Sequence, residues 1–126
     1  MIKINDNRKI SEIQEDFSKT FPFLKVIFYT VSDGINSGTE KYLQIKNTSK
    51  KIGEYRMSCG KGINVIYPDQ TVFDIEKFFK AQYNLMVYVF RKSGKAWLET
   101  SATGNWSLEK QNSEGELLST PYKENY

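Results

Sequence analysis

The chain contains no histidine and a single cysteine. The missing imidazole removes the commonest metal ligand and the commonest general base near neutral pH. Cys59 has no second thiol for an internal disulfide, so a reducing, cytoplasmic setting is expected. An apolar run of about 18 residues, the length that spans a membrane, is absent, and the opening MIKINDNRK lacks the apolar stretch of a secretory signal. We therefore expect no metal, cofactor, membrane partner or catalytic residues, and no enzyme.

The composition indicates one folded domain over residues 1–126. Hydrophobic residues make up 39% of the chain and charged residues 26%, as in a globular protein rather than a disordered one. The net charge of +3 is unevenly spread. Residues 41–62 carry six basic side chains against Glu54, whereas residues 99–126 carry two basic against five acidic side chains. We interpret both segments as solvated rather than as a nucleic-acid surface.

Two segments of the chain show helical spacing of apolar residues, each followed by a strand pattern. After the first helix, Pro22 ends the helical geometry and residues 24–31 read as a strand. Before the second helix, Thr71 is placed to cap its N-terminus with Asp74. The first helical set is Ile10, Ile13, Phe17 and Phe21, and the second is Val72, Ile75, Phe79 and Tyr83.

The two sets match at an offset of 62 residues, and the strands after them match at 61. This predicts an internal repeat of two βαβ units, the first over about 2–31. A basic connection over about 32–62, expected to be mobile, precedes the second unit with its hairpin, about 63–100. In the C-terminal tail, 101–126, Ser107 is a candidate cap for a short helix that ends near Gly115.

Two tandem βαβ units most simply build a ferredoxin-like two-layer α+β sandwich, a mainly antiparallel sheet with both helices on one face. Right-handed crossovers leave room between the two strands of each unit, and interleaving the units fills both gaps. Residues 2–4 and 63–67 would then be neighbours in one sheet. The turn at Gly94 would add an extra C-terminal hairpin strand. A β-grasp or another α+β layout is the alternative.

Strand alternation sorts the side chains of the two main strands by face. One face is too apolar and aromatic to be left bare, so the tail, a second copy or a ligand should cover it. We therefore predict a small non-enzymatic interaction module that binds a protein partner or forms a homodimer. Residues expected to meet the helices are Leu24, Val26, Phe28, Leu85, Val87 and Val89. The predicted interaction face holds Ile27, Tyr29, Met86, Tyr88 and Phe90.

The hairpin over residues 90–99 supports an alternative function. It sets Arg91, Lys92 and Lys95 beside Trp97, a combination that contacts phosphates and stacks on bases in proteins that bind single-stranded nucleic acid. The glycine–aromatic signature of RNA-recognition folds is absent. The competing interpretation is a solvated turn with Trp97 packed into the sheet.

Two other sets of residues are candidate chemical sites. Cys59 precedes Lys61, which would lower the thiol pKa, but no histidine is present as a base, so an inert thiol is the better interpretation. Helical carboxylates such as Glu12 and Glu76 are interpreted as solvated faces rather than as acid–base or cation sites.

The segment from Phe90 to Asn112 resembles a group of short, uncharacterised bacterial proteins that share an FRKSG–WLET–T–W[ST]LE pattern. The resemblance implies a bacterial, cytoplasmic setting and brings no activity, cofactor or catalytic residue with it. The matching residues are Phe90, Arg91, Lys92, Ser93, Gly94, Trp97, Leu98, Glu99, Thr100, Thr103, Trp106, Ser107, Leu108 and Glu109.

Overall fold

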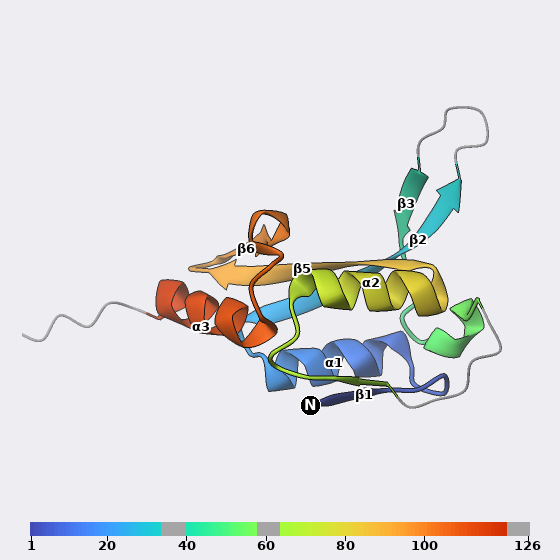
Figure 1. Cartoon of the computed structure of the whole chain (residues 1–126), viewed down its shortest axis with the longest axis horizontal. Coiled ribbons are helices and arrows are strands. Elements are labelled where there is room, and N and C mark those ends of the chain that lie inside the picture. The colour runs from blue at the N-terminus through green and yellow to red at the C-terminus, as the bar shows by residue number, and fades with distance from the viewer. Residues whose placement is uncertain (34–39, 58–63, 121–126) are drawn as a thin grey trace, which may run out of the picture.

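The computed structural model describes residues 1–33, 40–57 and 64–120 (Figure 1). The chain is α+β, with antiparallel sheets and helices packed against them. No helix within these ranges is long and apolar enough to cross a membrane. The elements are β1 (Ile2–Ile4), α1 (Ile10–Thr20), β2 (Leu24–Asp33), β3 (Glu40–Gln44), η1 (Ile52–Tyr55), β4 (Asn64–Ile66), α2 (Val72–Tyr83), β5 (Leu85–Ser93), β6 (Ala96–Glu99), η2 (Ser101–Thr103) and α3 (Leu108–Ser119).

The strands form two sheets rather than one. β1 pairs with β4, Ile2 opposite Ile66, as the repeat prediction expected, but in a two-stranded sheet of their own. The main sheet has the order β3-β2-β5-β6, with every neighbouring pair antiparallel. β1 and β4 are three residues each, whereas β2 and β5 pair directly along Leu24–Thr30. The longer strands β2 and β5 bury more apolar surface by pairing with each other than with the short strands. The single interleaved sheet of the ferredoxin-like prediction is therefore not confirmed.

The two predicted helices form where the apolar spacing placed them. Thr71 Oγ1 accepts a hydrogen bond from the Asp74 backbone N–H (3.1 Å), and the Asp74 carboxylate accepts one from the Thr71 N–H (3.0 Å). This is the predicted capping box at the start of α2. Asn84 ends α2 in the left-handed region with φ of 51°, a conformation that asparagine tolerates better than most residues.

The core lies between the helices and one face of the main sheet. Phe28 on β2 meets Phe79 on α2 edge to face, with ring centroids 4.9 Å apart. The alternation predicted for the two main strands is confirmed, because every residue expected to meet the helices is buried. Those residues are Leu24, Val26, Phe28, Leu85, Val87 and Val89.

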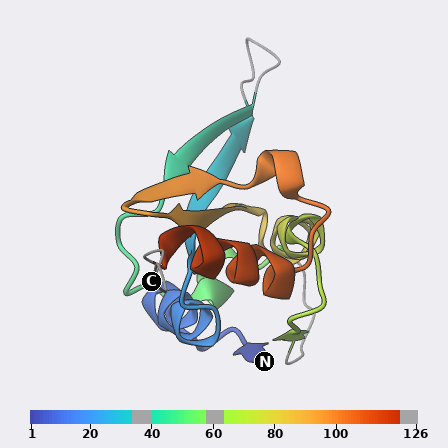
Figure 2. The same ribbon diagram turned by 90° about the vertical axis from the view of Figure 1, so that its left-hand side faces the viewer.

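The C-terminal segment forms a full helix that joins this core. Ser107 Oγ caps α3 as predicted, accepting a hydrogen bond from the Lys110 N–H (3.0 Å), but the helix continues to Ser119. Leu108 is fully buried in the core cluster. A Cβ at Gly115 would lie 2.8 Å from the Phe23 Cβ, so glycine permits the close approach of α3 to the start of β2. α3 therefore lies on the same side of the sheet as α1 and α2 (Figure 2).

A polar clasp ties the short helix η1 to the rest of the fold. Arg56 Nε donates to both carboxylate oxygens of Asp6 (2.9 and 2.7 Å), and the Tyr83 hydroxyl donates to Asp6 Oδ1 (3.0 Å). A Cβ at Gly53 would lie 2.6 Å from the Asp6 carbonyl oxygen, so glycine allows η1 to pack against this backbone. The clasp connects segments that are far apart in the chain.

Candidate functional site

The face of the main sheet opposite the core is here called the open face. No helix among the described residues lies across it (Figure 2). The five side chains predicted to form an interaction face are all half-buried there. Strand register adds Lys25 and Glu99, which flank Phe90 in one cross-strand row, and pairs Lys92 with Trp97. The open face is therefore apolar and aromatic at its centre and charged toward β6.

Aromatic rings form a connected path over the open face. Tyr29 and Tyr88 pack edge to face with centroids 5.1 Å apart, and the Phe90 centroid lies 6.5 Å from that of Tyr88. The Lys25 ammonium lies 4.7 Å from the Trp97 ring centroid and 5.8 Å from that of Phe90. Such contacts between a cation and a ring are attractive because the ring face is negative. The open face therefore already holds one cation on its rings.

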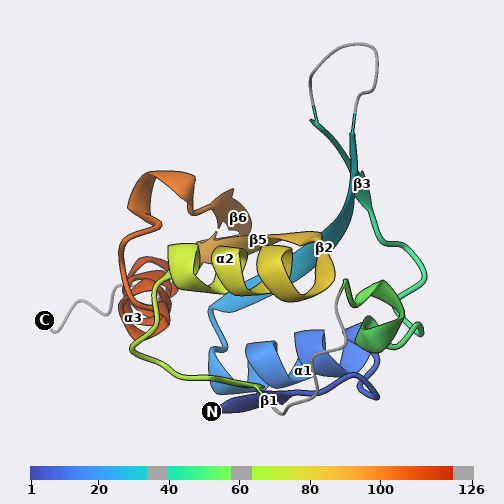
Figure 3. The same ribbon diagram turned by 45° about the vertical axis from the view of Figure 1, so that its right-hand side comes forward.

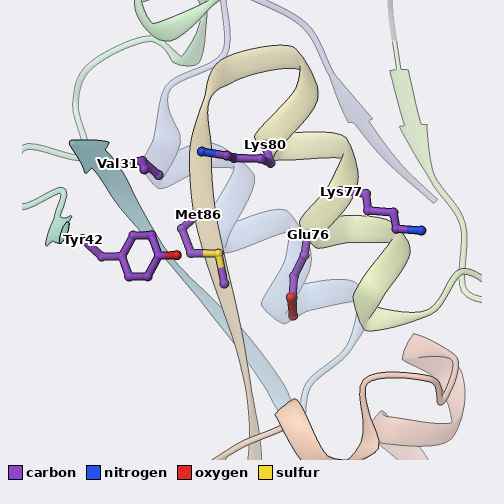
Figure 4. A pocket seen from close by; sticks show the side chains of 6 residues that line it. All are labelled: Val31, Tyr42, Glu76, Lys77, Lys80 and Met86. Carbon is purple, nitrogen blue, oxygen red and sulfur yellow. The ribbon is translucent and has the colours of Figure 1, made fainter. Parts of the chain in front are cut away.

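A pocket of about 260 Å³ opens at the end of the open face away from β6 (Figure 4). β2 and β3 extend past the helices (Figure 3). Val31 on β2 and Tyr42 on β3 line the pocket together with residues of α2 and of the start of β5. Met86 belongs both to the predicted interaction face and to the pocket lining. The volume is below the roughly 300–1,000 Å³ of drug-sized sites and suits one inserted side chain. The lining residues are Val31, Tyr42, Glu76, Lys77, Lys80 and Met86.

Two carboxylates, those of Glu76 and Glu99, act on the centre of this surface. Burial raises the pKa of Glu76, and the nearby charge of Glu99 raises it further. Burial also raises the pKa of Tyr88, with further increases from Glu99, Tyr29 and Glu76. Glu76 is half-buried, so it is less solvated than the interpretation as a solvated helix face expects. The sequence signal for this was its position one residue after the buried Ile75, at the border of the apolar stripe of α2.

The predicted nucleic-acid residues are separated by the sheet. Arg91 lies in the row of Leu24, on the helix-covered face, where it donates a hydrogen bond to Gln111 Oε1 (2.8 Å). Lys92 and Trp97 form a cross-strand pair on the open face. Lys95 is exposed in the turn, where Gly94 takes the positive φ expected of it, 63°. Only three of the four residues can therefore act together.

The remaining polar clusters do not form a chemical site. The polar groups of the clasp, on Asp6, Arg56 and Tyr83, hydrogen-bond to one another. Burial and the hydrogen bond to Asp6 raise the pKa of Tyr83 to about 12. The described ranges contain no group of three or more acidic or cysteine side chains that could hold a metal ion. The loop with Cys59 and Lys61 lies outside the described residues.

Comparison of the chain with protein-family models, with curated protein sequences and with solved structures gave no match. The functional assignment therefore rests on the geometry of the open face.

Proposed function

We propose that the chain is a small non-enzymatic interaction module that binds a protein surface through the open face, in the cytoplasm. The observation that supports this is the apolar aromatic side of the main sheet, which no described segment covers. Monomeric proteins rarely leave a contiguous apolar patch of more than a few hundred Å² in water. Tyrosine and phenylalanine are also enriched at protein interfaces, where they bury large areas at a low entropic cost.

The position of α3 supports the same proposal. The C-terminal tail, a second copy and a ligand are the three expected covers of the apolar face. The helix of the tail, α3, packs on the other side of the sheet instead, with Leu108 in the core. Leu117 and Leu118, which point away from the core, are 71% and 51% exposed. A partner protein, a second copy of the chain or a ligand then remains to cover the rings, and the aromatic side chains favour a protein surface.

Two measurements on the full chain test the proposal: sedimentation velocity from micromolar to millimolar concentration, and panning of a random-peptide display library. We expect the wild-type chain either to dimerise or to select a set of peptides. The Tyr29→Ala, Tyr88→Ala variant should lose that dimerisation or that peptide binding. Leu117→Ala, which shortens an exposed apolar side chain on another surface, is the matched control. A strict monomer that selects no peptide, or binding that survives the Tyr29→Ala, Tyr88→Ala change, contradicts the proposal.

A second candidate function, single-stranded nucleic-acid binding, is favoured by the surroundings of Trp97. Its ring lies under the Lys25 ammonium and beside Lys92, with Lys95 in the adjoining turn. Lysines next to an exposed ring are suited to phosphate contacts and base stacking. A labelled oligothymidylate should then bind in a salt-dependent manner and be lost in the Lys92→Glu, Lys95→Glu variant. Unchanged affinity in that variant, or no binding by the parent chain, rules this function out.

A further inference from the structure

Resting on the proposed function, we infer that the partner of the open face is a basic protein segment, which places a lysine or arginine side chain beside Tyr88, between the carboxylates of Glu76 and Glu99. The apolar character of the open face does not specify the chemistry of the partner, whereas the arrangement of charge around its rings does.

The two carboxylates approach the same ring from different elements. Glu99 on β6 lies opposite Phe90, the next residue but one after Tyr88 on β5. Glu76 on α2 lines the pocket together with Met86, which precedes Tyr88 by two residues on the same face of β5. Burial raises the pKa of Tyr88, and the nearby charges of Glu99 and Glu76 raise it further. Tyr88 therefore lies near two carboxylates that belong to different elements, although the whole chain carries a net charge of +3.

The chain itself supplies no counter-ion to Glu76 within the described residues. The ion pairs of Arg8 with Asp16 and of Arg56 with Asp6 involve neither Glu76 nor Glu99. Glu76 also makes no hydrogen bond to a described residue. A half-buried carboxylate without a partner is costly, and an incoming cation would remove much of that cost.

The lysines near Glu76 are directed elsewhere. Lys80 donates a hydrogen bond to Asn84 Oδ1 (2.9 Å), and in Figure 4 its ammonium points toward Val31 while Lys77 points away from Met86. Lys25 lies over Trp97. None of them is among the influences on the pKa of Glu76, which are burial and Glu99.

The rest of the surface fits the stem of a long basic side chain. Val31, Tyr42 and Met86 give the pocket apolar walls, against which the methylene groups of lysine or arginine can pack while the charged head reaches Glu76. The contact of Lys25 with Trp97 shows the same pairing of ring and cation within the chain. A phosphate backbone would meet like charge at this point, which favours a basic protein segment over nucleic acid.

The test uses peptides selected from the display library on the full wild-type chain. We expect each selected peptide to contain lysine or arginine among apolar residues. Replacing that residue by norleucine or citrulline, or the protein carboxylates by Glu76→Gln, Glu99→Gln, should weaken binding about tenfold or more, as when one partner of an interfacial charge pair is removed. The matched control is Glu15→Gln, Glu116→Gln, which removes the same charge from exposed positions on α1 and α3 and should leave affinity unchanged.

The outcomes separate this inference from the proposed function. Peptides that need Tyr29 and Tyr88 but not a basic residue, or that bind the Glu76→Gln, Glu99→Gln variant unchanged, overturn the inference and leave the interaction module standing. A dimer that is lost with Tyr88→Ala, or oligothymidylate that competes with the peptides, also overturns it by assigning the face to another occupant. Binding that is insensitive to Tyr29 and Tyr88 overturns both.

Discussion

The side chain of Gln111 should carry a large share of the stability that α3 adds to the fold. It is fully buried on the inner side of the helix. Gln111 Nε2 donates to the Thr103 carbonyl oxygen (2.8 Å) and hydroxyl (2.9 Å), and Gln111 Oε1 accepts from Arg91 (2.8 Å). One side chain thus joins α3 to η2 and to β5. The substitution Gln111→Ala removes all three hydrogen bonds at once.

The expected loss follows from these bonds. A neutral hydrogen bond contributes about 1 kcal/mol and one to a charged group about 1.5–3 kcal/mol. The better helix propensity of alanine returns a few tenths of a kcal/mol. We therefore expect Gln111→Ala to lower the free energy of unfolding by about 3 kcal/mol, a large fraction of the roughly 5–15 kcal/mol typical of a domain.

Urea unfolding followed by circular dichroism measures this loss, and Ser113→Ala, an exposed position on the same helix, is the matched control. The control should change stability by no more than about 0.5 kcal/mol. Gln111→Leu separates bonding from packing, because leucine keeps most of the volume and none of the hydrogen bonds. A loss for Gln111→Ala no greater than that of the control would refute the reasoning. A leucine variant as stable as wild type would assign the effect to volume.

Three further changes have definite signs. Gly115→Ala should destabilise the chain by about 1 kcal/mol or more in urea unfolding, despite the gain in helix propensity, because its Cβ would meet Phe23 at 2.8 Å; a stabilised variant would show that α3 can shift. Glu76→Gln should raise the free energy of unfolding at pH 7 and less so at pH 4, because the raised pKa of Glu76 means that its ionised form destabilises the folded chain; equal effects at both pH values would contradict this. The pKa of about 12 for Tyr83, above the ordinary tyrosine value of about 10, means that the hydroxyl keeps its proton to a higher pH in the folded chain than in the unfolded chain. Its contribution to stability should therefore be intact below pH 10 and lost between pH 10 and 12, and a Tyr83→Phe variant should lack this loss in an alkaline unfolding series.

The sequence by itself determined the local elements and the sorting of side chains. Apolar spacing fixed α1 and α2, because a helix can bury only one stripe and that stripe recurs with the helical period. Alternation along β2 and β5 placed Leu24 and Val87 inside and Tyr29 and Tyr88 outside, because successive strand residues face opposite ways. Residue type alone also predicted the Thr71 cap and the turn at Gly94. These features depend on near neighbours in the chain, which the sequence records directly.

Tertiary structure decided the sheet order, the side on which α3 packs, and the charge around the open face. β1 and β4 carry the apolar residues that a common sheet needs, but direct pairing of the longer β2 and β5 leaves them in a sheet of their own. Arg91 and Lys92 are adjacent in the chain and lie on opposite faces, and Glu76 and Glu99 belong to different elements that become neighbours only in the fold. Such outcomes depend on which pairing of apolar surfaces buries the largest area. The competing segments are distant in the chain, so local sequence patterns do not show which pairing buries more.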